Sequence, residues 1–183
     1  KYKINIKFNN QIKYGLLPKP HYTTKNLSIL RDDKEIGNVK NFKIYVKGNN
    51  LLLSKGIKFA NLTFNGSDFN IYQEDLIFFE ELLKTEPSEN KIVIKNSNIF
   101  FKNDNDDILF INKIKKSEFY YDSYNLVNIL KSKNEIFNIP YKLIIKNDKF
   151  NKLVLTKFNS QKIRLNIENQ ISYDSKIQQG LMK

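Results

Sequence analysis

The chain has 183 residues, 40% of them apolar, no cysteine and a formal net charge of +12. This length suits one domain with a single core or one long sheet, and the lack of cysteine excludes a disulfide framework and a thiolate metal site. No apolar run reaches the length of a transmembrane helix and no signal-peptide pattern is visible, so neither is predicted within these residues.

The first part of the chain alternates between apolar and polar residues with the period of a strand. Ile4, Ile6 and Phe8 alternate with lysine and asparagine, and Phe42 and Ile44 alternate with lysine and tyrosine. This period of two predicts half-buried strands, and the glycines and prolines between them predict loops. The predicted strands of this part are residues 3–8, 23–30, 39–47, 51–53, 57–64 and 69–72.

Two hairpin turns are predicted from glycine and asparagine. The pair Asn65-Gly66 is the clearest turn signal in the chain, because Asn-Gly is favoured in two-residue hairpins. It predicts that strands 57–64 and 69–72 pair with each other. The run of glycine and two asparagines at 48–50 predicts a second hairpin.

The centre of the chain holds the one predicted helix, near residues 74–84. Leu76, Phe79 and Leu83 recur there at helical spacing, and Pro87 follows as a stop signal. An acidic turn is predicted between the two strands after the helix. The predicted elements after the helix are strand 91–101, turn 103–107, strand 108–114 and strand 119–122.

The last part of the chain predicts further strands, with one ambiguous segment. Residues 124–131 suit a strand or a short helix capped by Ser123. Pro140 lies within the extended segment 135–146 and predicts an edge or a bulge there. The other predicted strands are residues 152–158, 162–168 and 171–177.

The spacing of the turns predicts the fold class. Turn signals recur about every eight to twelve residues, which is typical of antiparallel meanders, so we expect a mainly β fold of about ten to twelve strands. No linker divides the chain, and a single β-rich domain over residues 1–183 is predicted. Because the chain starts at Lys1 within a predicted strand, we expect the chain to be a fragment of a longer protein.

Residues that could carry catalysis are few. His21 is the only histidine and has no acidic neighbour in sequence, so a surface loop position is predicted. Glu80 and Glu81 are adjacent and point to different sides of the predicted helix. The acidic turn at 103–107 has no calcium-loop glycine or glutamate, which predicts a solvated hairpin tip. We therefore predict no enzyme activity, no cofactor and no metal.

The positive charge leaves two interpretations open. A basic, aromatic-rich chain is typical of a single-stranded nucleic-acid-binding β module, in which lysines contact phosphates and aromatic rings stack on bases. However, Arg31 and Arg164 are the only arginines, and a chain rich in lysine, asparagine and isoleucine can be basic through AT-rich codons alone. Nucleic acid is therefore disfavoured as a partner.

One stretch resembles a known family. After the predicted helix, strand 91–101 reads KIVIKNSNIFF, followed by strand 108–114 and segment 118–122. This resembles the AsmA-like proteins of Gram-negative envelopes, which include the TamB-type bridge-like lipid transfer proteins, with Ser97 where that family usually has glycine. The aspartate that the family usually has after the second apolar patch is displaced here into residues 103–107. Segment 18–30 is similar to the proline and following strand that the family has early in the domain.

The resemblance implies an elongated, curved antiparallel β-sheet, a β-groove lined with apolar side chains. It also implies a periplasmic protein, anchored in the inner membrane by a segment outside this chain, that binds or transfers phospholipid and supports outer-membrane assembly.

The apolar residues of the alternating strands are the candidate lipid-binding residues. Because each strand alternates, its apolar side chains share one side, and in a meander these sides can align into one trough. The alternatives are a closed core and a purely structural envelope module without a ligand. The lipid-groove candidates are Ile4, Ile6, Phe8, Phe42, Ile44, Ile92, Ile94, Ile163, Leu165 and Ile167.

Overall fold

The protein is a single large β-sheet. The computed structural model describes residues 4–31, 33–47, 59–72, 90–172 and 179–182. These residues form strands and turns, and the 12-stranded sheet confirms the mainly β prediction. The strands are β1 (Ile4–Phe8), β2 (Lys13–Gly15), β3 (His21–Arg31), β4 (Lys34–Val46), β5 (Phe59–Tyr72), β6 (Lys91–Lys102), β7 (Ile108–Asp122), β8 (Val127–Ile136), β9 (Ile139–Asp148), β10 (Leu153–Ser160), β11 (Leu165–Ser172) and β12 (Gln179–Met182).

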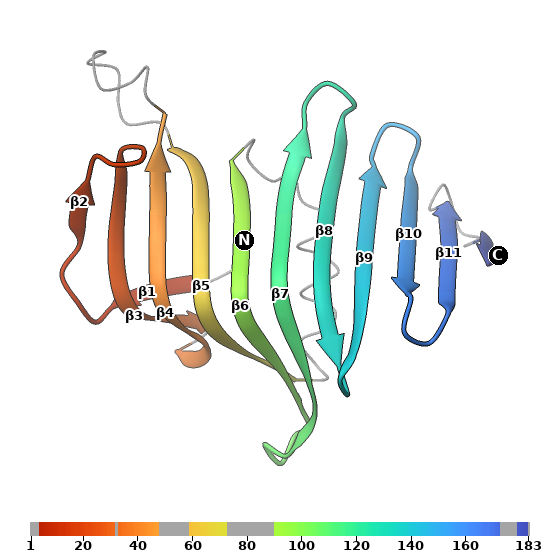
Figure 1. Ribbon diagram of the computed structural model, residues 1–183, viewed down its shortest axis with the longest axis horizontal. Coiled ribbons are helices and arrows are strands. Elements are labelled where there is room, and N and C mark those ends of the chain that lie inside the picture. The colour runs from red at the N-terminus through yellow and green to blue at the C-terminus, as the bar shows by residue number, and fades with distance from the viewer. Residues whose placement is uncertain (1–3, 32, 48–58, 73–89, 173–178, 183) are drawn as a thin grey trace.

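The strands follow the chain from one edge of the sheet to the other. The order is β1-β3-β4-β5-β6-β7-β8-β9-β10-β11-β12, with β2 paired to β3 (Figure 1). Every pair is antiparallel except β5 and β6, which are parallel. This corrects the expectation of a wholly antiparallel sheet. A parallel pair requires a crossover connection, and the predicted helix near 74–84 falls in that connection, outside the described residues.

A bend line crosses five neighbouring strands at one level. We define it by Asn26, Lys40, Gly66, Asn96 and Lys115, one residue in each of β3 to β7 that has no partner in the pairing register. Three of the five have positive φ, at 51° for Asn26, 66° for Gly66 and 47° for Asn96. Figure 1 shows β5, β6 and β7 curving below their midpoints toward the β6–β7 hairpin.

The bend line shifts the alternation of side chains by one residue. Thr24 and Leu27 are three residues apart and are both buried, with exposed residues between them. In β6, the half-buried Ile94 and the buried Ser97 are separated in the same way. Without the extra residue, the period of two would turn every side chain beyond the bend to the opposite face.

The predicted hairpin at Asn65-Gly66 is therefore wrong. The two residues lie inside β5, and the predicted strands 57–64 and 69–72 are parts of that one strand. Asn-Gly does supply positive φ here, at Gly66, but uses it to bend a continuous strand. A Cβ at Gly66 would lie 3.3 Å from Cδ of Lys40 on the neighbouring strand, so the position favours glycine.

Other strand boundaries also differ from the predictions. The two predicted strands 108–114 and 119–122 are one strand, β7, with a bulge at Lys115 and a further register shift at Leu109. Segment 124–131 contains no helix, because Asp122 closes a turn and β8 begins at Val127. Pro140 lies at the start of β9 and pairs with Glu135 of β8. The pairing of β9 with β10 begins only at Lys142, so Pro140 lies at a local edge, as predicted.

Four-residue turns of one kind connect the C-terminal strands. Asp122 and Asp148 each accept a hydrogen bond from the backbone N–H three residues later, at 3.2 and 2.9 Å. The last residue of each turn has positive φ, as at Leu126 and Lys152. The turn at 161–164 ends the same way at Arg164, so Ile163 lies in a turn and not in the predicted strand 162–168.

The closed core is small and lies at the N-terminal side of the sheet. Leu27, Val39 and Phe42 form its buried centre, with Ile44 and Phe64 packed against them. Among the described residues only eight apolar side chains are buried, because one layer of strands cannot enclose both of its faces. No helix in the described parts of the chain is long and apolar enough to cross a membrane.

The bend line predicts the effect of replacing Gly66. Gly66→Ala forces a Cβ into positive φ and should reduce the free energy of unfolding in urea by about 1–2 kcal/mol. Gly66→Asn should reduce it less, because asparagine tolerates this conformation better than alanine. Equal losses for the two variants would show that crowding against Lys40, rather than φ, determines the preference for glycine.

Candidate functional site

The apolar face of the sheet is built from rows of residues that are direct partners across neighbouring strands. Direct partners in a sheet share one face. One row runs from β4 to β9 and consists of Ile44, Leu62, Ile92, Phe119, Leu130 and Ile145. A second row on the same face begins with Phe42 and Phe64, whose ring centroids are 4.9 Å apart, and continues with Ile94.

Eight of the ten predicted lipid-groove residues lie on this apolar face. Phe42 is buried, whereas Ile6, Phe8 and Leu165 remain between 40% and 45% exposed. Ile4 pairs with Arg31 through β1, and its side chain is outside the described part of the structure. Ile163 is not on the face, because it lies in the turn before β11 and is 47% exposed. The eight residues are Ile6, Phe8, Phe42, Ile44, Ile92, Ile94, Leu165 and Ile167.

Buried polar side chains divide the apolar face in the middle. In the row of Ile94, the next two partners are Ser117 and Ser132, before Leu143 and Phe158 resume the apolar pattern. Ser132 donates a 2.6 Å hydrogen bond to Asn134 on the same strand. The predicted single apolar trough is therefore two apolar areas joined through the row that contains Phe119 and Leu130.

A half-buried phenol lies beside these polar side chains. Tyr141 Oη donates to Oδ1 of Asn112 at 3.0 Å, across β7, β8 and β9. Burial raises the pKa of Tyr141, so this donor keeps its proton at neutral pH. The hydrogen bond satisfies polar groups that would otherwise be costly on an apolar face.

The opposite face carries a row of lysines that the sequence did not reveal. We call this side the lysine face, and Lys95, Lys116, Lys133 and Lys142 the lysine row. They are successive direct partners on β6, β7, β8 and β9, and all four are exposed. Like charges at directly opposed positions of a sheet are destabilising.

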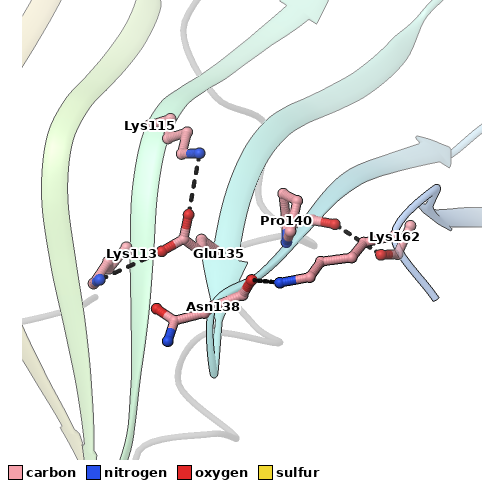
Figure 2. Close-up of polar contacts among 7 residues, drawn as sticks. Lys113, Lys115, Glu135, Asn138, Pro140 and Lys162 are labelled. Carbon is pink, nitrogen blue, oxygen red and sulfur yellow. Dashed lines mark hydrogen bonds and ion pairs between the residues drawn. The ribbon is translucent and has the colours of Figure 1, made fainter.

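Two glutamates hold lysines on the lysine face. Glu118 contacts Lys116 at 2.6 Å and Lys91 at 2.7 Å, and these hydrogen bonds lower the pKa of Glu118 to about 2. Glu135 contacts Lys115 at 3.1 Å and Lys113 at 3.3 Å, which also lowers its pKa (Figure 2). Each carboxylate therefore stays ionised well below neutral pH.

The lysine face is hollowed near each end of β8, β9 and β10. A hollow of about 500 Å³ lies beside the turns after Asp122 and Asp148, and its walls include Val127, Ile129 and Leu155. A hollow of about 180 Å³ lies at the other end and is lined mainly by lysines and amides. The lysine residues of this second hollow, which we call the lysine hollow, are Lys115, Lys133, Lys142 and Lys162.

Sequence reasoning missed both hollows because their walls depend on strand pairing. Lys133 and Lys142 are nine positions apart and become neighbours only through the β8–β9 hairpin. The apolar wall at Val127 and Ile129 lies in the segment that also suited a helix. The one local signal was the strict alternation of lysine in β8, at Lys131 and Lys133.

The predicted position of His21 was wrong, whereas that of the acidic turn is confirmed. His21 is only 7% exposed, begins β3 and donates from Nδ1 to the carbonyl oxygen of Lys19 at 2.8 Å. The acidic turn is an exposed hairpin tip in which Asn103 Oδ1 accepts the N–H of Asp107 at 2.9 Å. Among the described residues no group of histidine, aspartate and glutamate is placed to hold a metal.

The lowered pKa of Glu118 predicts a loss of stability in acid. Its pKa is about 2 in the folded chain and ordinarily 4.5, so its contribution is complete above pH 4.5 and is lost as the pH falls toward 2. Glu118→Gln should cost roughly 1 kcal/mol at pH 7, since both lysines are partly exposed.

The measurement is the free energy of unfolding at several pH values. Glu118→Gln should flatten the profile between pH 4.5 and 2 relative to the wild type. Glu168→Gln is the control, because among the described residues Glu168 forms a single ion pair, with Lys157. The Glu168 side chain is 45% exposed and that of Lys157 is 44% exposed. Parallel profiles for the wild type and Glu118→Gln would contradict the prediction.

Comparison with known proteins does not assign the chain to a family. No family model matches it, and no curated protein matches it. The resemblance to AsmA-like proteins rests on the strand pattern within residues 76–122, of which the structure describes the part that forms β6 and β7. Any function that it implies for this chain is therefore a proposal.

Proposed function

We propose that the protein binds phospholipid, without catalysis, by holding acyl chains against the apolar face of the sheet. The observation that carries the proposal is the register, which collects apolar side chains from most strands on one side of a single sheet. In the described residues all strands belong to that sheet, so no second sheet formed by them covers this side. The AsmA-like resemblance favours the same function.

The chemistry of the apolar face suits acyl chains. Ile6, Phe8 and Leu165 are each 40% exposed or more, although they share the face with buried Phe42. Exposed apolar side chains aligned across several strands mark sites for an apolar ligand or partner more often than isolated ones do. Each methylene of an acyl chain buried against them contributes about 0.8 kcal/mol.

The register argues against base stacking as the alternative. Phe101, Phe119 and Tyr121 lie on the apolar face, whereas Phe100 and Tyr120 lie on the lysine face. The aromatic residues that alternate with lysine in the sequence are therefore divided between two sides of the sheet. Base stacking needs several aromatic rings beside cations on one surface, and the lysine face holds only two of these five rings.

Photocrosslinking tests which face meets lipid. A photoreactive amino acid at Ile94 or Leu165 should form adducts with phospholipid in a Gram-negative host, identified by mass spectrometry of the purified protein. The matched controls are Lys95 and Asn166, because each is the next residue in the same strand and points to the opposite face. The yield of adducts at Ile94 and Leu165 should exceed the yield at the two controls by about tenfold or more, since acyl chains are excluded from the charged side.

Two outcomes would remove the proposal. Equal labelling at Ile94 and Lys95 would show that contact with lipid is not confined to the apolar face. No adduct at any of the positions, with no lipid recovered from the purified protein, would favour a structural module without a ligand.

A further inference from the structure

The lysine hollow concentrates positive charge that the described residues do not neutralise. Lys116 forms an ion pair with Glu118, and Lys115 forms one with Glu135. Lys133 and Lys142 are exposed direct partners on β8 and β9, and neither has an ion pair within the part of the chain that the structure describes. Both residues line the lysine hollow.

The turns at the end of the hollow add further donors. Lys162 is held there by a 2.8 Å hydrogen bond from Nζ to the carbonyl oxygen of Asn138, which fixes its ammonium group beside the β8–β9 turn (Figure 2). An ammonium group has three donors, so two remain for a ligand. Asn159 is the direct partner of Lys142 and, with Gln161, lines the same hollow with amide groups.

The neighbouring backbone is fixed. Ser160 Oγ donates to the carbonyl oxygen of Pro140 at 2.8 Å, which ties the end of β10 to the start of β9. Ser160 is 1% exposed. The wall of the hollow between these strands is therefore set by the fold before any ligand binds, and a preformed site costs less ordering entropy on binding.

The donor set indicates the class of ligand. Lysine presents a compact point charge that suits phosphate, whereas planar carboxylates are bound best by arginine, and neither arginine of the chain lines the hollow. A volume of about 180 Å³ holds roughly six waters at ~30 Å³ each, which is enough for a phosphate or diphosphate group. Beyond the hollow, the lysine row continues to Lys116, which shares Glu118 with Lys91.

We infer that the lysine hollow is a binding site for a phosphate-type anion, held by Lys133, Lys142 and Lys162 with amide groups from Asn159 and Gln161. The anion offsets the repulsion between the opposed lysines of β8 and β9. Phosphate chemistry is shared by soluble phosphates and by lipid headgroups. The site lies on the opposite face of the sheet from the proposed acyl-chain surface and does not depend on it.

The test uses a double variant and a matched control. Lys133→Gln/Lys142→Gln removes two charges from the hollow. Lys25→Gln/Lys43→Gln removes two charges from the same face at β3 and β4, far from the hollow. Binding of inorganic pyrophosphate is measured by calorimetry, and binding to phosphatidylglycerol vesicles is measured by sedimentation, with phosphatidylcholine vesicles as the neutral reference.

The wild type should bind at least one of the two anionic probes, and the hollow variant should bind it about tenfold or more weakly, since two charge-assisted contacts are lost. The control variant should lose less than about threefold, as expected for a change in net charge alone. Pyrophosphate binding assigns the site to soluble phosphates, and binding to phosphatidylglycerol vesicles alone assigns it to lipid headgroups.

Equal losses in the two double variants, or no binding of either probe by the wild type, would overturn the inference. Photocrosslinking at Ile94 should be unchanged in the hollow variant, so failure of this site and failure of the acyl-chain proposal can be told apart. Thermal unfolding of both variants checks that a loss of binding does not reflect a loss of folding.

Discussion

A shift of one residue in the side-chain alternation of five neighbouring strands governs the chemistry of both faces. Each of β3 to β7 leaves one residue out of the register at the bend line, and the strands bend together because all five omissions lie at the same level. Polar side chains replace the backbone pairing that is lost there. Ser97 Oγ accepts the N–H of Ser67 at 3.0 Å and donates to the carbonyl oxygen of Lys95 at 2.7 Å.

The bend line keeps the apolar residues of both halves of each strand on one side. Beyond it Leu27, Val39 and Ile114 lie on the same face as Phe42 and Ile94. Without the shift, these residues would lie on the lysine face. One long bent sheet can therefore present an extended apolar surface without a second sheet. The consequence is that its closed core is small.

The strands could be predicted from the sequence because alternation is a local property. Lysine and isoleucine alternate in β6 whatever the neighbouring strands do, as at Ile92, Ile94 and Lys95. The failures have non-local causes. The Asn65-Gly66 pair has the residues of a hairpin turn, yet the registers of β4 and β6 determine that it bends a continuous strand. His21 looked like a loop residue because the packing of Gly15 and Tyr45 around its ring is invisible in the sequence.

In the candidate site, too, local features could be predicted from the sequence and non-local features could not. Alternation alone predicted which side of each strand is apolar, and the register places eight of the ten residues on a common face. Alternation could not predict that the serines of β7 and β8 lie side by side in the middle of that face, because the pairing of Ser117 with Ser132 depends on the register between the two strands. The lysine hollow was missed for a related reason, since two hairpins assemble it.

The two faces are coupled through the geometry of the sheet. The register that aligns Ile92, Phe119 and Leu130 on one side also sets Lys116, Lys133 and Lys142 directly opposite one another on the other. Hydrogen bonding fixes neighbouring strands at about 4.8 Å, so the backbone cannot relax to separate these charges. Glu118 and Glu135 hold lysines of β6 and β7, and Glu168 holds Lys157 of β10. Among the described residues, no carboxylate forms an ion pair with Lys133 or Lys142. The charge left on β8 and β9 can only extend into water or meet an anion.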